Sequence, residues 1–172
     1  MLTVEEFKKI PDPPGGHYEL HHGELVLVTP PAKEHAQIGK QLWRILDRIS
    51  AGWYVDKVLA FRPLPEYEVW TADVAMVTQQ RLRSADLGGW LSGSPDLVAE
   101  VLSPSNTAQE INDRRWTCFQ SGCQEFWVLD PKRETIEVST ADGRSRKYTA
   151  DDEIPLDRFV PGKMAVGEVF AD

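Results

Sequence analysis

Apolar residues recur along the chain at two spacings, one typical of helices and one typical of strands. Between residues 34 and 50 they repeat every three or four positions, at Ile38, Leu42, Ile45, Leu46 and Ile49, which predicts an amphipathic helix. A second helix is predicted over residues 107–122, where Thr107 and Glu110 form a capping box ahead of the same spacing. Thr3 and Glu6 predict a short helix that ends at Pro11.

Shorter apolar runs predict the strands. Four of them, expected in the sheet, cover residues 54–62, 71–77, 96–102 and 125–130. Two hairpins are predicted around His21-His22-Gly23 and Ala141-Asp142-Gly143. Residues 79–94 contain Gly88, Gly89 and Gly93 and predict an exposed excursion. Residues 154–170 are expected to form an edge strand or turn that covers the sheet.

Two of these strands each contain an acid that needs a partner. Glu100 alternates with Leu97, Ala99 and Val101 in a strand that is apolar on both faces. A carboxylate there costs several kcal/mol unless it is paired, hydrogen-bonded or bound to a metal. Asp73 stands in a similar strand, and neighbouring strands lie about 4.8 Å apart, so two such acids can share a divalent cation. The pattern leaves one alternative open, in which both acids have a purely structural role.

Composition and charge restrict the function classes. The 172 residues are 41% apolar and 27% charged, which is typical of one globular domain over residues 1–172. The net charge of −8 does not attract nucleic acid unless a local basic groove or bound cations reverse the field. Cys118 and Cys123 lack metal-site spacing and indicate reduced thiols. Without a signal segment or an apolar run of about 20 residues, we expect a cytoplasmic protein that does not span a membrane.

Five sequence blocks, in this order, resemble the Uma-two family of restriction endonuclease-like proteins, within the PD-(D/E)XK nuclease superfamily. They are Tyr18-Glu19-Leu20-His21-His22-Gly23-Glu24-Leu25, Thr29-Pro30-Pro31 with Glu34-His35, Ala72-Asp73-Val74-Ala75, Pro95 to Ser105, and Glu125-Phe126-Trp127-Val128-Leu129-Asp130-Pro131. The resemblance covers nearly the whole chain. It implies an α/β fold with a restriction endonuclease-like α-β-β-β-α-β core, a mixed sheet, an N-terminal hairpin and C-terminal strands.

The resemblance also implies a site. Asp73 and Glu100 would bind Mg²⁺ or Mn²⁺, DNA would be the substrate, and a homodimer is expected because related nucleases cut duplexes with two sites. The lysine usual two positions after the glutamate is Leu102 here. Family members typically place a lysine on the following helix, and we take the equivalent position to be Arg115, which helical spacing turns toward the sheet. An arginine can hold a carboxylate or phosphate but cannot act as a base.

The role of Arg115 therefore stays open between an electrostatic stabiliser and an ion pair with Glu100 or Asp73 in an inactive site. If a lysine-like role is real, Arg115→Lys should raise activity. Two functions follow from these alternatives. One is a metal-dependent endonuclease that hydrolyses DNA phosphodiester bonds. The other is a catalytically inactive nuclease-like domain that binds nucleic acid or a protein partner.

Glu19, Asp96, His35 and Glu34 are further candidate residues. Glu19 matches the N-terminal glutamate of the family and would add a metal ligand, position a water or simply order the hairpin. Asp96 follows Pro95 and is expected to shape the start of its strand. His35 is expected to be a boundary histidine with a backbone partner. The alternative is that His35 or Glu34 points into a site.

Overall fold

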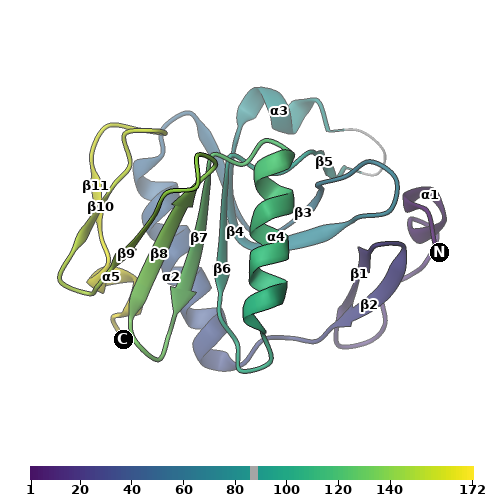
Figure 1. Ribbon diagram of the computed structural model, residues 1–172, viewed down its shortest axis with the longest axis horizontal. Coiled ribbons are helices and arrows are strands. Elements are labelled where there is room, and N and C mark those ends of the chain that lie inside the picture. Colours follow the sequence, from purple (N-terminus) through teal and green to yellow (C-terminus); the bar gives the residue numbers. More distant parts are fainter. Residues whose placement is uncertain (86–88) are drawn as a thin grey trace.

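A seven-stranded mixed sheet forms the centre of the molecule in the computed structural model, which describes residues 1–85 and 89–172. The strand order is β5-β3-β4-β6-β7-β8-β9 (Figure 1). The bounds are β3 (Trp53–Arg62), β4 (Trp70–Thr78), β5 (Leu91–Ser92), β6 (Leu97–Val101), β7 (Glu125–Asp130), β8 (Thr135–Thr140) and β9 (Ser145–Tyr148). Helices α2 (Lys33–Ile49) and α4 (Ala108–Gln120) lie on opposite faces of this sheet.

Each face of the sheet has its own apolar core. The α2 side buries Leu42 and Leu46 against Ala99 of β6 and Trp127 of β7. The α4 side buries other residues, among them Ile111, Cys118, Val98 and Phe126. Alternate residues of β6 thus enter different cores, as expected for an interior strand.

The order α2-β3-β4-β6-α4-β7 is the predicted α-β-β-β-α-β core. Strands β3, β4 and β6 pair antiparallel, whereas β6 and β7 pair parallel, with Glu100 opposite Val128. Helix α4 makes the crossover that a parallel pair requires. The expected fold class is confirmed.

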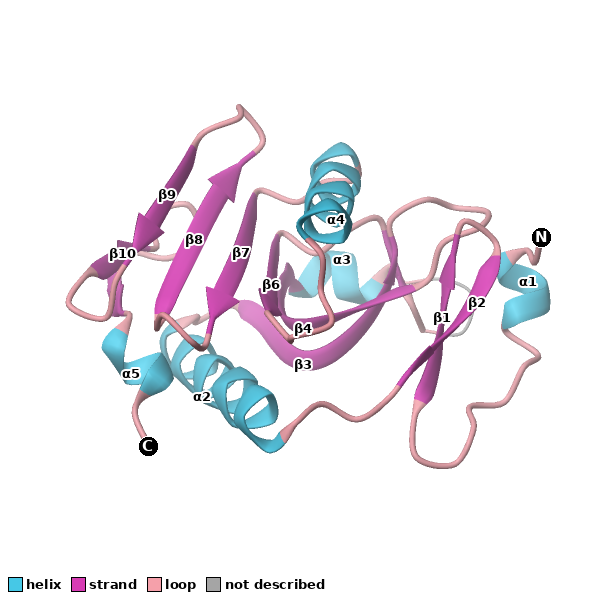
Figure 2. Cartoon of the chain, turned by 60° about the horizontal axis from the view of Figure 1, so that its bottom comes forward, coloured by secondary structure: helices cyan, strands magenta, loops and turns pink. Residues whose placement is uncertain are grey.

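Smaller elements surround the core (Figure 2). The hairpin of β1 (His17–His21) and β2 (Glu24–Val28) joins the sheet through a bridge between Leu20 and Val69. The capping box of Thr3 and Glu6 begins α1 (Val4–Phe7) as predicted. In the part of the chain that the structure describes, no helix is long and apolar enough to cross a membrane.

Two regions differ from the expectation. Residues 79–94 contain α3 (Gln79–Arg83) and β5, and both Leu91 and Ser94 are buried rather than exposed. The Thr78 hydroxyl caps α3 by accepting a hydrogen bond from the Arg81 N–H. The glycines of this segment predicted a loop instead of this short helix. Gly88, one of the glycines on which the predicted excursion is based, lies outside the described residues.

The closing segment is not an edge strand of the main sheet. It forms the separate hairpin β10 (Glu153–Pro155) and β11 (Lys163–Ala165), followed by α5 (Gly167–Phe170). Ile154, Met164 and Val169 enter the core on the α2 side. The expected covering role is therefore correct, although the strand pairing is different. Both cysteines are free and buried.

Candidate active site

The structure brings Asp73 and Glu100 together on neighbouring strands. The last pair of the β4–β6 ladder is Val74 with Ala99, so Asp73 and Glu100 occupy the next step along the two strands. Residues opposite each other in an antiparallel pair point to the same face. The Val101 N–H donates a 2.8 Å hydrogen bond to Asp73 Oδ2. The Asp73 carboxylate is thereby fixed where the ladder ends.

An arginine of α4 reaches these acids, but it is Arg114 and not Arg115. Arg114 Nε donates to Glu100 Oε1 at 2.7 Å, and Arg114 Nη1 lies 3.8 Å from Glu19 Oε2. Its Nη2 donates to the Thr71 carbonyl oxygen. The guanidinium carbon lies 5.0 Å from the centre of the Trp70 ring. Arg114 thus links β1, β4 and β6 to helix α4.

Arg115 faces the sheet as predicted, but it meets β8 instead of the acids, which corrects its predicted contacts. Its Nη2 donates to Glu137 Oε1 of β8 at 2.9 Å, and its guanidinium lies 5.8 Å from the Phe126 ring centre. Successive helix positions differ by about 100°, so Arg114 and Arg115 flank the buried line through Ile111 and Cys118 by about 50° on either side. Helical spacing alone directs both arginines toward the sheet. The packing of α4 on the sheet determines that Arg114, and not Arg115, contacts the acids.

Glu19 uses both carboxylate oxygens within the protein. Glu19 Oε1 accepts a 2.8 Å hydrogen bond from the Thr71 N–H, and Oε2 lies 2.6 Å from His21 Nε2. Burial raises the pKa of Glu19, but His17, His21 and the charge of Arg114 outweigh it and hold that pKa well below the ordinary value. These contacts favour a role in anchoring the hairpin and Arg114, and they leave Glu19 poorly placed as a metal ligand.

Glu19→Gln should therefore destabilise the protein by about 2 kcal/mol at neutral pH, because charge-assisted hydrogen bonds to a buried carboxylate are lost. Because the pKa of Glu19 is lower in the folded state than in the unfolded state, its carboxylate stabilises the folded protein above the unfolded-state pKa of 4.5. This contribution to stability is lost as the pH falls below 4.5. Urea unfolding between acidic and neutral pH should show this loss in the wild type, and Glu19→Gln should reduce it. The exposed Glu24 of the same hairpin gives the control, Glu24→Gln. Equal pH dependence in all three proteins would contradict the anchoring role.

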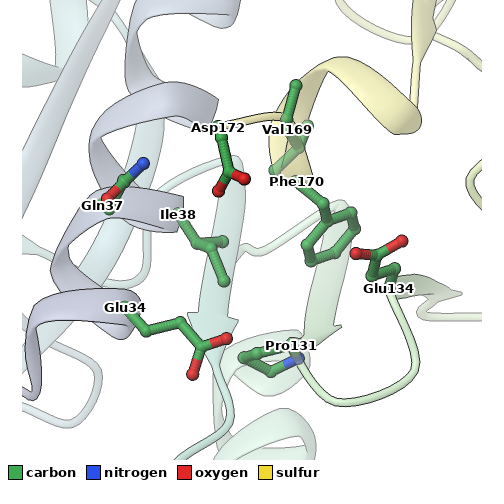
Figure 3. Close-up of a pocket in the computed structure, with 9 residues that line it drawn as sticks. Glu34, Gln37, Ile38, Pro131, Glu134, Val169, Phe170 and Asp172 are labelled. Atoms are coloured by element: carbon green, nitrogen blue, oxygen red, sulfur yellow. The ribbon is translucent and has the colours of Figure 1, made fainter.

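His35 has the predicted backbone partner, at Val101, and it also reaches the site, which was the alternative interpretation. Its Nε2 lies 3.3 Å from Asp73 Oδ2, and its side chain is 16% exposed. The hydrogen bond to Asp73 raises the pKa of His35, and burial opposes this shift. Its neighbour Glu34 instead lines a separate surface pocket formed with Pro131, Glu134 and Phe170 (Figure 3). The sequence signal for His35 was its position at the end of the buried stripe.

Asp96 is buried at the start of β6 and belongs to a structural network. Its Oδ2 accepts a 3.0 Å hydrogen bond from Arg81, and its Oδ1 accepts one from Gln124 at 3.0 Å. Arg81 also donates to the Ser94 carbonyl oxygen at 2.7 Å. This network holds α3 and the following segment against the sheet, in agreement with the strand-shaping role expected for Asp96.

The site holds more carboxyl groups than arginines. The pKa of Glu100 is raised to about 8: burial raises it most, Arg114 lowers it, and the charges of Asp73 and Glu19 raise it again. The same two glutamates raise the pKa of Arg114, against the effect of burial. A single arginine thus serves two buried carboxyl groups. Glu19 takes the ionised form, whereas the raised pKa of Glu100 favours its neutral form at neutral pH in the metal-free protein.

This donor set suits a hard divalent cation. Asp73 uses Oδ2 and Glu100 uses Oε1 for protein contacts, and no described residue donates a hydrogen bond to Asp73 Oδ1 or Glu100 Oε2. Among residues 1–85 and 89–172, no three His, Cys, Asp or Glu side chains are grouped so as to hold a metal. Magnesium accepts one or two carboxylates and retains several waters. The residues present therefore fit Mg²⁺ or Mn²⁺ better than an ion that requires a complete protein cage.

Comparisons with known proteins agree with this architecture. A search of curated proteins gave no match. Among solved structures, a protein from Anabaena variabilis ATCC 29413, described as a putative nuclease belonging to DUF820, superposes with a TM-score of 0.82 at 18% identity, over 99% of this chain and 98% of that one. At this identity the likeness establishes the fold. The sequence profile of the family Uma2, described as "Putative restriction endonuclease", matches residues 4–166. The chain therefore belongs to the Uma2 family.

Proposed function

We propose that the protein is a divalent-metal-dependent endonuclease that hydrolyses phosphodiester bonds in DNA. The observation that carries this proposal is the pair of acids, Asp73 and Glu100, at the end of the β4–β6 ladder, each with one carboxylate oxygen that no donor among the described residues contacts. Membership of a family described as restriction endonucleases supports the choice of reaction and substrate. The nuclease-like fold supports it as well.

Asp73 and Glu100 would hold Mg²⁺ or Mn²⁺ through the oxygens that no donor among the described residues contacts. A bound ion of this kind lowers the pKa of a coordinated water and neutralises charge on the phosphate. Arg114 would act as a positioning residue, because its Nε fixes the Glu100 carboxylate and its Nη2 fixes the β4 backbone at Thr71. Its guanidinium stays protonated and does not serve as a base.

The direct test is nicking of supercoiled plasmid DNA by the purified protein with Mg²⁺, with Mn²⁺ and with EDTA. We expect nicked product with either metal and none with EDTA. Calorimetry with Mn²⁺ should show binding. Absence of both nicking and metal binding would overturn the proposal. Analytical ultracentrifugation of the same preparation tests the homodimer expected of a nuclease that cuts both strands.

His35→Phe should weaken Mn²⁺ binding because it removes the hydrogen bond that orients Asp73. We expect the affinity to fall at least about tenfold, because changing a residue that supports a metal ligand typically costs about 10–100-fold. Calorimetry measures this directly. His35→Gln keeps a side-chain donor and should recover part of the affinity. If the His35→Phe and His35→Gln variants both bind Mn²⁺ as tightly as the wild type, His35 does not position Asp73.

A second candidate function is a catalytically inactive nuclease-like domain that binds nucleic acid or a protein partner. The observation that favours it is the Arg114–Glu100 ion pair, because a buried arginine bound to the glutamate also describes a closed, structural site. DNA binding that needs no metal, with no cleavage of plasmid, linear duplex or single-stranded DNA, would favour this function over the first.

A further inference from the structure

The outward side of α2 carries three cations in a row. Lys33, Lys40 and Arg44 follow one another at i, i+7 and i+11 and are all exposed. At about 100° per residue they lie within about 40° of one another, opposite the buried Leu42. Figure 2 shows α2 on the outside of the molecule. We refer to Lys33, Lys40 and Arg44 as the α2 basic face.

The fold does not use these three charges. Within the described residues, no member of the α2 basic face forms an ion pair, whereas Arg48 of the same helix lies 3.6 Å from Glu168. The three line a shallow surface hollow whose other polar members are Gln37, Gln41 and Asp172. Among the described residues, three cations without an ion-pair partner thus share this side of α2 with two acids, Asp172 in the hollow and the exposed Asp47 of the helix, in a protein whose net charge is −8.

The α2 basic face begins in the turn of α2 that reaches the candidate active site. His35, two residues after Lys33, contacts Asp73 at 3.3 Å from the opposite side of the helix. From Lys33 to Arg44 the helix rises about 16 Å, at 1.5 Å per residue. Phosphates of one duplex strand are spaced about 3.4 Å along the axis, so this length spans about five of them. A backbone that leaves the acids, passes around the first turn of α2 and continues along its outward side would meet all three cations.

We propose that the α2 basic face binds the sugar-phosphate backbone of the DNA whose target phosphate lies at Asp73 and Glu100. The choice of DNA as the polyanion rests on the proposed function. Contacts of this type position the duplex and carry no sequence information. They would also provide the local basic groove that an acidic protein needs to approach DNA.

The test measures binding without cleavage. Fluorescence anisotropy of a short labelled duplex is recorded in EDTA over a range of salt concentrations, with the triple variant Lys33→Gln, Lys40→Gln and Arg44→Gln. We expect at least about tenfold weaker binding at low salt, with the salt dependence reduced by about one counterion per lost contact. The matched control is Arg144→Gln, Arg146→Gln and Lys147→Gln on the β8–β9 hairpin, which changes the net charge equally at exposed positions. It should bind as the wild type does.

Each outcome decides the inference. Equal weakening of DNA binding in both triple variants would show that only net charge matters, and would overturn the inference. Unchanged binding by the α2 variant would overturn it too, as would the absence of binding by the wild type. Selective loss in the α2 variant without any metal-dependent nicking would support the inference and refute the nuclease function. Nicking that the α2 substitutions leave unchanged would support the function and refute the inference. Circular dichroism checks that both variants are folded.

Discussion

Asp73→Asn and Glu100→Gln should each abolish metal-dependent nicking, with a loss of at least about 100-fold. Each amide keeps the shape of the acid but removes the charge that a hard divalent cation requires. Each change should also weaken Mn²⁺ binding in calorimetry, which separates loss of the ion from loss of the fold. Glu100→Gln should fold normally, because the raised pKa of Glu100, about 8, already favours its neutral form at neutral pH in the metal-free protein.

The matched control for this prediction is Glu137→Gln. Glu137 also pairs with an arginine of α4, at 2.9 Å, but it lies on β8 beside Arg115 and away from Asp73. It should leave nicking and Mn²⁺ affinity unchanged. Activity that survives both Asp73→Asn and Glu100→Gln would show that these acids are not the metal ligands.

Arg114→Met should destabilise the protein by about 3–5 kcal/mol, the usual cost of removing one partner of a buried ion pair. Glu100 and Glu19 would lose their shared cation, and the Thr71 carbonyl oxygen would lose a donor. Arg115→Met should cost about 1 kcal/mol or less, because its pair with Glu137 is partly open to water. Urea unfolding at neutral pH compares the two. Equal losses would show that the two arginines carry equivalent roles.

Arg114→Lys tests the lysine-like role at its corrected position. A lysine keeps the charge and can reach Glu100, but it cannot also make the contact with Thr71, so part of the stability should be lost. We expect faster nicking than in the wild type, because the freed ammonium would take the role that the sequence resemblance implies for a lysine. Arg115→Lys should change nothing. An intact fold without any gain in nicking would count against a lysine-like role for position 114.

Local patterning determined most of the core. The apolar spacing in residues 34–50 and the capping box at Thr107 specify α2 and α4, because one buried stripe and one satisfied helix end suffice to define each. Alternation within the strands placed Asp73 and Glu100 each in an apolar strand, since the side-chain period of a strand is two. The resemblance to a known family then implied the order of the core elements, which the structure confirms.

Tertiary packing decided which side chains surround the acids. Arg114 and Arg115 lie about equally close to the buried line of α4, so their order depends on where the helix crosses the sheet. His35 meets Asp73 only because the first turn of α2 reaches the end of the β4–β6 ladder. Glu19 meets Thr71 across a separation of 52 residues. Periodicity describes the direction of a side chain within its own element, whereas these contacts depend on how one element is offset against another.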